Sequence, residues 1–216
     1  MKIICQGDAP PLGCYTNPPI KDYVYSMDAH TTHLVWNEEA RQKVFTCPIF
    51  SIWESTCRSP DQQLRLFTVL DAPDWAIVVP VLTTPRGKEF VMVRQWRHGA
   101  KELSLEFPGG VFEKGEDPQT TAARELREET AYDAGTIRSL GVYSPNPAIM
   151  ANRVHFFIAE DLRPLPQQDL DEDEYVEVSL VPIKEVFQNM GRPPYIHALM
   201  GAALSLLHNV DTWRDP

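Results

Sequence analysis

The sequence predicts an α+β fold in which a mixed β-sheet lies between helices, preceded by a small N-terminal β subdomain. Three observations predict it. Short segments rich in β-branched and aromatic residues recur along most of the chain, one helix with a clear start signal interrupts them, and two helical segments close the chain. Strands on both sides of a helix are typical of a sheet that packs against helices.

The N-terminal region is predicted to contain two parts. Residues 1–40 are Pro-rich and weakly periodic, which predicts an irregular arm. Residues 41–72 are predicted to form a β-hairpin, with strands over 44–53 and 64–70 and a turn at 58–61. Because an isolated two-stranded ribbon is marginal in water, its apolar side chains need a surface to cover. That surface is either the rest of the chain or a second copy of it.

Residues 73–216 are predicted to form the main domain. The continuous apolar run over 75–82 is typical of a buried strand, and the later strands are marked by β-branched and aromatic residues between turn signals. The full set of expected elements is strands over 75–82, 90–93, 101–107, 137–143, 154–159 and 175–181, and helices over 183–190 and 195–208.

The stretch from residue 110 to residue 132 carries most of the functional information. Asp117-Pro118 predicts a helix start, with Asp as the N-cap and Pro in the first helical position. In that helix Glu125, Glu128 and Glu129 stand at i, i+3 and i+4, so their carboxylates share one face. Like charges at this spacing destabilise a helix by a few tenths of a kcal/mol per pair, which favours a bound cation. Carboxylate oxygens suit Mg²⁺ or Mn²⁺. The simpler alternative is a solvated face, because Glu is a good helix former.

Composition narrows the class of protein. The formal net charge of −10 argues against electrostatic binding to nucleic acid or to an anionic membrane. The first apolar run is too short for a signal peptide, and no run approaches the ~18 apolar residues of a membrane span. The four cysteines are scattered and form no C-x-x-C pair, which favours reduced thiols. We therefore expect a soluble, cytoplasmic protein.

The stretch resembles the box of the Nudix hydrolases, G-x5-E-x7-R-E-U-x-E-E-x-G-U, where U is apolar. One position departs from this pattern, because Ala131 replaces a Gly near the helix end, where a positive φ is often needed. Ala there costs roughly 1 kcal/mol but removes no ligand. The resemblance implies an α/β/α sandwich with a mixed sheet. The matching residues are Gly110, Glu116, Arg124, Glu125, Leu126, Glu128, Glu129 and Tyr132.

The flanking segments are similar to those of the ADP-ribose and ADP-sugar pyrophosphatases. Residues 94–97 resemble the R-Q-x-R segment of that branch, and residues 105–110 resemble its L-E-x-P-A-G segment. A proline follows the box at Pro147, and an acidic loop over 171–174 precedes an alternating strand. The resemblance covers roughly residues 44–190. Taken singly, the arginines could be surface cations, the proline a strand stop and the loop a solvated turn.

The resemblance implies a role for each of these residues. A divalent ion, Mg²⁺ or else Mn²⁺, would be held by carboxylates and one carbonyl, and Arg124 would hold the glutamates in place. The base would be Glu172, with Glu128 as the fallback. The metal ligands would be Glu125, Glu129, Glu174 and the Gly109 carbonyl; the substrate-binding residues would be Arg94, Arg97, Glu106 and Pro147; and Gly110 and Glu116 would be structural.

The expected reaction is hydrolysis of a nucleoside diphosphate linked to a sugar, with ADP-ribose, giving AMP and ribose 5-phosphate, as the favoured substrate. The resemblance also implies a homodimer in which the N-terminal hairpin packs across a two-fold axis, with Trp53 or a neighbour close to the partner's substrate. Other substrates stay open, among them GDP-mannose, other nucleotide sugars and dinucleoside polyphosphates. A different class, the ligand sensors that regulate transcription, usually has a degenerate box and a DNA-binding segment, whereas the box glutamates here are intact.

Overall fold

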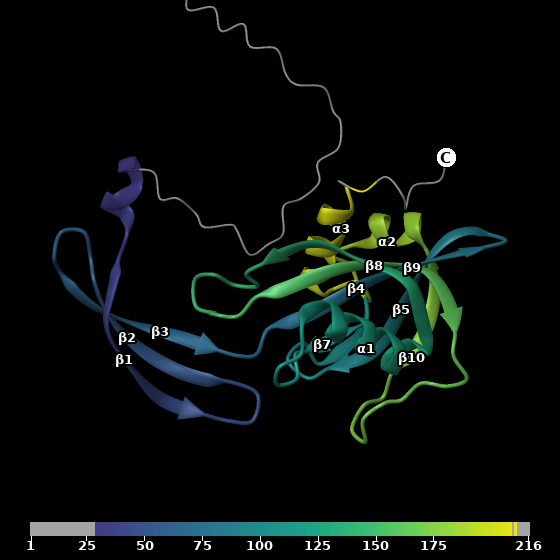
Figure 1. The fold of residues 1–216 in the computed structure, drawn as a ribbon, viewed down its shortest axis with the longest axis horizontal. Helices are drawn as coiled ribbons and strands as arrows, with labels where there is room; N and C mark the ends of the chain where they lie inside the picture. The colour runs from purple at the N-terminus through teal and green to yellow at the C-terminus, as the bar shows by residue number, and fades with distance from the viewer. Residues whose placement is uncertain (1–28, 209, 211–216) are drawn as a thin grey trace, which may run out of the picture.

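The computed structural model describes residues 29–208 and 210. A short 3-10 helix, η2 (Ala29–Leu34), leads into an antiparallel sheet in the order β1-β2-β3, formed by β1 (Asn37–Thr46), β2 (Ser51–Arg58) and β3 (Leu64–Asp71). This N-terminal sheet stands to one side of the main body (Figure 1). Most of the expected arm, residues 1–28, lies outside the described residues, and β1 begins four residues before the expected start of the subdomain.

The prediction of one continuous strand over 44–53 is wrong. The chain turns between β1 and β2, where the Cys47 amide donates to the Phe50 carbonyl at 2.9 Å. Pro48 explains the break, because it has no N–H to donate to a strand ladder. The subdomain therefore has three strands and not two. The turn expected at 58–61 is confirmed, since the Gln62 amide donates to the Ser59 carbonyl at 2.9 Å.

A central sheet forms the body of the molecule. Its strand order is β10-β5-β4-β9-β8, with β6 paired to β5 and β7 paired to β4. The pairing of β4 with β9 is parallel and the other pairings are antiparallel, so the sheet is mixed, as expected. The strands are β4 (Trp75–Thr84), β5 (Gly87–Arg97), β6 (Glu102–Glu106), β7 (Gly109–Val111), β8 (Tyr132–Tyr143), β9 (Val154–Pro164) and β10 (Glu177–Pro182).

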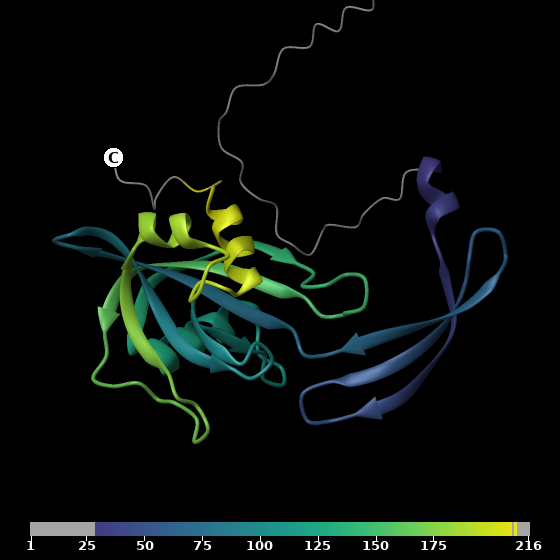
Figure 2. The same ribbon diagram turned by 180° about the vertical axis from the view of Figure 1, so that it is seen from behind.

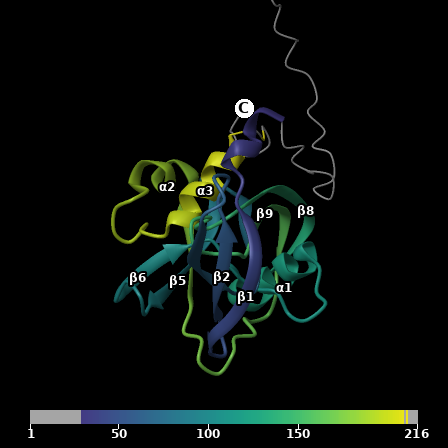
Figure 3. The same ribbon diagram turned by 90° about the vertical axis from the view of Figure 1, so that its left-hand side faces the viewer.

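Helices cover both faces of the central sheet. Helix α1 (Pro118–Thr130) packs on one face, and α2 (Ile183–Asn189) and α3 (Ala198–Leu207) pack on the other (Figures 2 and 3). Each face has its own buried cluster, which contains Leu126 on the α1 side and Phe156 on the α3 side. The expected α/β/α layering is confirmed.

Helix α3 starts later than the expected residue 195. The Tyr195 amide donates to the Arg192 carbonyl at 2.7 Å and closes a turn before the helix begins. Pro193 and Pro194 account for this, because neither has an N–H and the residue before a proline disfavours the helical region. No helix within the described residues is long and apolar enough to cross a membrane.

The N-terminal sheet is joined to the main body by more than the chain connection at residue 72. The Leu70 amide in β3 donates to the Ile149 carbonyl at 2.7 Å, and the Ala151 amide donates to the Leu70 carbonyl at 3.0 Å. Leu70 and Met150 form a parallel bridge. The β8–β9 loop therefore extends the ladder of β3.

Candidate active site

Helix α1 has the start and end that its sequence predicts. The Asp117 carboxylate accepts from the amides of Gln119 at 3.1 Å and Thr120 at 3.2 Å, and Pro118 occupies the first turn. The helix ends at Ala131, whose φ of 56° and ψ of 34° are left-handed. The expected positive φ at this departure from the Nudix box is confirmed, and it is the conformation that a Gly would adopt at lower cost.

Two carboxylates of α1 are buried one helical turn apart. Glu125 is 7% exposed and Glu129 is 4% exposed. Burial raises the pKa of Glu125 to about 7 and that of Glu129 to about 8, and the negative charge of Glu174 contributes to both shifts. One oxygen of Glu129 accepts from the Gly109 amide at 2.8 Å. Such a pair is costly without a partner charge.

Arg124 connects the other carboxylates of the helix. Its Nε donates to Glu116 at 3.1 Å, and one terminal nitrogen donates to Glu125 at 2.9 Å and to Glu128 at 2.8 Å. Burial alone lowers the pKa of Arg124, but its bonds to Glu116 and Glu128 and the charge of Glu125 outweigh burial and raise it. The guanidinium therefore fixes the position of three carboxylates.

The glycine turn makes room for these groups. A Cβ atom placed on Gly110 would lie 2.6 Å from Cδ and 2.8 Å from Oε2 of Glu125, and closer still to Oε1. A Cβ on Gly109 would lie 2.9 Å from the Cα of Ile77 in β4. Gly109 lets β7 approach β4, and Gly110 lets the Glu125 carboxylate lie against the turn. No other residue type fits at either position without movement.

The carboxylates of α1 fit a hard divalent cation that takes some of its ligands from the protein and the rest from water and the substrate. In residues 29–208 and 210, no three His, Cys, Asp or Glu side chains are close enough together to hold an ion by themselves. The two buried carboxylates, Glu125 and Glu129, are the oxygen ligands that a hard divalent cation prefers, and such an ion usually completes its coordination with waters and substrate phosphates.

A pocket of about 280 Å³ lies beside the glycine turn. Arg97 and Glu106 form its charged part, joined by two hydrogen bonds of 2.8 and 2.6 Å. Burial alone raises the pKa of Glu106, but the Arg97 hydrogen bond and nearby positive charge lower it overall. The charge of Arg97 also acts on Glu129, so the pocket and the carboxylate pair are neighbours. Its lining residues are Trp75, Ala76, Ile77, Arg97, Glu106, Phe107, Gly109, Gly110, Val111, His197 and Leu199.

The structure does not bring every predicted site residue to this pocket. Arg94 does not line it; the charge of Arg94 acts on Tyr195, whose pKa rises to about 12 mainly through burial. Pro147 is exposed in the β8–β9 loop. Glu172 and Glu174 are exposed in the loop before β10, where the Glu174 amide donates to the Asp171 carbonyl at 3.0 Å.

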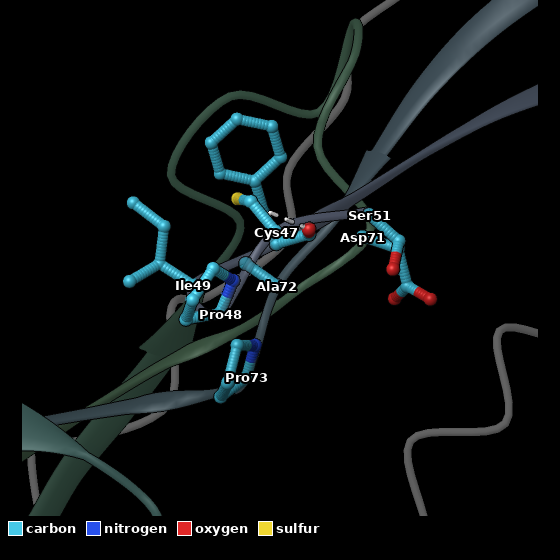
Figure 4. Close-up of a pocket in the computed structure, with 8 residues that line it drawn as sticks. Cys47, Pro48, Ile49, Ser51, Asp71, Ala72 and Pro73 are labelled. Carbon is cyan, nitrogen blue, oxygen red and sulfur yellow. Dashed lines mark hydrogen bonds between the residues drawn. The ribbon is translucent and has the colours of Figure 1, made fainter. Parts of the chain in front are cut away.

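Two features escaped the sequence reasoning. His197 and Leu199 reach the pocket from the start of α3, beyond the last residue of the resemblance. A second hollow, at the base of the N-terminal sheet, is lined by the β1–β2 turn and the β3–β4 connection and contains none of the predicted site residues (Figure 4). In it the Cys47 thiol donates to the Phe50 carbonyl at 3.4 Å.

Residues 73–199 match the model of the NUDIX domain, which is more than half of the chain. The chain belongs to the Nudix family. The recognition made from the sequence is therefore confirmed, and so is the expectation of a Nudix pyrophosphatase at the level of the family.

Two relatives and one solved structure show what this chain is similar to. The chain is 32% identical to an ADP-ribose pyrophosphatase of Bacillus subtilis over 150 residues, which are 69% of this chain and 80% of the relative. It is 34% identical to the methanol dehydrogenase activator of Bacillus methanolicus over 51% of this chain and 60% of that protein. A crystal structure of an ADP compounds hydrolase superposes with a TM-score of 0.70 at 20% identity, over 80% of this chain and 92% of that one, which shows the shared fold.

Proposed function

We propose that this Nudix protein hydrolyses a nucleoside diphosphate linked to a sugar in a reaction that depends on Mg²⁺. ADP-ribose is the favoured substrate. The observation that supports this proposal most strongly is the buried pair Glu125 and Glu129, which lies beside a pocket with an Arg97–Glu106 ion pair. The relative from Bacillus subtilis supports the choice of ADP-ribose. The products would be AMP and ribose 5-phosphate.

Different residues of the chain would bind the metal, position the carboxylates and bind the substrate. Glu125, Glu129 and the Gly109 carbonyl would hold the metal; Glu174 stays the further ligand that the family resemblance implies, although among the described residues its side chain does not form a three-carboxylate cluster with the other two. When bound, the ion neutralises the diphosphate and makes a coordinated water more acidic. Arg124 keeps the carboxylates of the helix in fixed positions through its bonds of 2.8 to 3.1 Å. Arg97 and Glu106 bind the part of the substrate that extends past Gly109.

Release of AMP tests this reaction. Purified protein with Mg²⁺ or Mn²⁺ should release AMP from ADP-ribose, and a panel that includes ADP-glucose, GDP-mannose and a dinucleoside polyphosphate, scored by kcat/KM, ranks the substrates. If no compound in the panel is cleaved with either metal, the proposal is wrong and a role as a ligand sensor becomes the better explanation.

For the general base we propose Glu172. The acidic loop leaves it exposed, whereas Glu128 is already held by Arg124 at 2.8 Å. A general base contributes typically 10²–10⁴-fold to the rate, so Glu172→Gln should lower kcat by about that factor and leave metal affinity nearly unchanged. Glu125→Gln should weaken metal binding as well. If Glu172→Gln keeps the wild-type kcat and Glu128→Gln loses it, the base is Glu128.

We also propose that the protein is a homodimer formed through the N-terminal sheet. The sheet leaves large apolar side chains exposed that the chain's own main domain does not cover, and obligate interfaces bury such surfaces. In solution, light scattering at micromolar concentration should give twice the 24.6 kDa monomer mass. A monomer mass with full activity would refute the dimer. The exposed residues are Leu34, Trp36, Val44, Phe45, Ile49, Leu64, Leu66 and Phe67.

We propose that the protein is located in the cytoplasm. Within the described residues Cys47 and Cys57 are free thiols, which supports a reducing environment.

A further inference from the structure

His197 is a pocket residue that the box and its flanks do not account for. It precedes α3, yet its side chain makes no capping bond to that helix. Its Nε2 lies 3.9 Å from Oε2 of Glu106, which is beyond the ~2.7–3.2 Å of a hydrogen bond. Glu106 itself is occupied by Arg97 through both oxygens. The imidazole therefore has hydrogen-bonding groups to offer to a ligand in the pocket.

The position of His197 is fixed by the segment around it. The Pro194 carbonyl accepts from the Leu105 amide of β6 at 2.9 Å, so the segment before α3 is bonded to the edge of the sheet. Tyr195 is buried, and its hydroxyl donates to Glu185 at 2.8 Å. On the other side, the Met200 amide donates to the His197 carbonyl at 3.1 Å and the Met200 side chain is buried. These contacts fix the backbone at His197 beside the pocket.

The pocket joins His197 to the carboxylate pair. Its lining runs from Gly109, whose amide bonds Glu129, past the Arg97–Glu106 pair to His197. A diphosphate held at Glu125 and Glu129 can thus extend one substituent along the pocket to the imidazole.

The chemistry of the pocket selects a kind of substituent. Because Glu106 neutralises Arg97, this end has little net positive charge for a further phosphate. The side chains of Trp75, Phe107 and Leu199 give it apolar walls. A neutral group with C–H faces for these walls and hydroxyls for Glu106 and His197 is complementary to it. A sugar has this combination.

We propose that His197 is a specificity-determining residue that, together with Glu106, binds a hydroxyl of the sugar carried by the diphosphate. This inference deepens the proposed function and depends on it. A hydroxyl oxygen that lies to one side of the 3.9 Å separation would be within hydrogen-bond distance of both Nε2 of His197 and Oε2 of Glu106, which are too far apart to bond each other directly.

The test compares two substrates that differ in the sugar alone. Wild type, His197→Ala and His197→Gln are assayed with ADP-ribose and with ADP esterified by ethanol at its β-phosphate, both with Mg²⁺. His197→Ala should lower kcat/KM for ADP-ribose about 10-fold, mainly through KM, as expected for one lost hydrogen bond in a pocket. Activity on the ethyl ester should stay within about twofold. His197→Gln keeps a hydrogen-bonding side chain and should recover most of the loss.

The control is His208→Gln, which changes an exposed histidine at the far end of α3 and should leave both activities unchanged. Melting temperatures of all variants check that they fold. Equal losses on both substrates, or no loss for His197→Ala, would overturn the inference while the proposed function stands. If the wild type cleaves neither ADP-ribose nor any other nucleotide sugar, the proposed function fails and the inference fails with it.

Discussion

Replacing Gly110 by Ala should remove most of the activity and leave the fold intact. The added Cβ would lie 2.6 Å from Cδ and 2.8 Å from Oε2 of Glu125, whereas ordinary van der Waals contact begins near 3.4 Å. The carboxylate must therefore shift by about 1 Å, which also disturbs its 2.9 Å bond to Arg124. What moves is the end of a side chain and not backbone, so the cost in unfolding free energy should be about 1–2 kcal/mol.

The loss of activity should be much larger than the loss of stability. A displacement of 1 Å in a catalytic group costs about 10²-fold in rate. The assay is kcat/KM for ADP-ribose at saturating Mg²⁺, with a Mg²⁺ titration and a melting curve for each variant. Gly99→Ala is the matched control, because a Cβ at Gly99 meets no atom within 4 Å.

A coupled change provides a stricter test. Glu125→Asp withdraws the carboxylate by one methylene, so the added methyl group at residue 110 has less to displace. The losses in log kcat/KM for the two single variants should therefore add to more than the loss for the double variant. Wild-type kcat/KM for Gly110→Ala, within about twofold and with a native melting curve, would refute the described contact between this turn and Glu125.

Three further predictions concern stability. Burial raises the folded-state pKa values of Glu125 and Glu129 from 4.5 to about 7 and about 8, so the folded state binds more protons there than the unfolded state. With divalent metal removed by a chelator, the two protonated carboxyls should contribute to the free energy of unfolding below pH 4.5, and this contribution should be lost as the pH rises to about 8. For Glu125 it is on the order of 3 kcal/mol. A melting temperature that depends on pH equally in wild type and in Glu125→Gln would contradict this. Ala131→Gly should stabilise the protein by about 0.5–1 kcal/mol in denaturant titration, since φ is 56°, and a loss would show that the left-handed cap is not strained. Arg124→Ala leaves the carboxylates of Glu116 and Glu125 without their partner, so it should lower the free energy of unfolding by about 2–4 kcal/mol at pH 8. The loss should be smaller at pH 6, where Glu125 is protonated. An equal loss at both pH values would count against the role of charge.

The parts of the fold that were predictable from sequence depend on local chemistry. Asp117, Pro118 and the spacing of the glutamates define α1 within a few residues, because capping and helical periodicity act over one or two turns. The apolar run in β4 was predictable because a strand buried on both faces needs no partner information. The split of 44–53 could have been predicted from Pro48, whose missing N–H is a local signal.

The pocket depended on contacts between distant segments. His197 reaches Glu106 across ninety-one positions in the sequence, and the carbonyl that anchors its segment belongs to Pro194, where no side-chain pattern marks a bond to Leu105. Arg94 and Arg97 look alike in sequence, but only Arg97 lines the pocket. The pairing of strands decides such placement, and that pairing is set by the whole fold.

The ladder between β3 and the β8–β9 loop bears on how this protein can be shortened. A chain cut to begin at residue 73 would match the limits of the Nudix domain but would strip the Ile149 carbonyl and the Ala151 amide of their partner, Leu70. The same loop passes directly into β9, which lies parallel to β4 from Trp75 onward. Fraying after the cut would start beside a strand that lines the pocket. We therefore expect a chain that starts at residue 73 to be less stable around this loop than a chain that keeps β3.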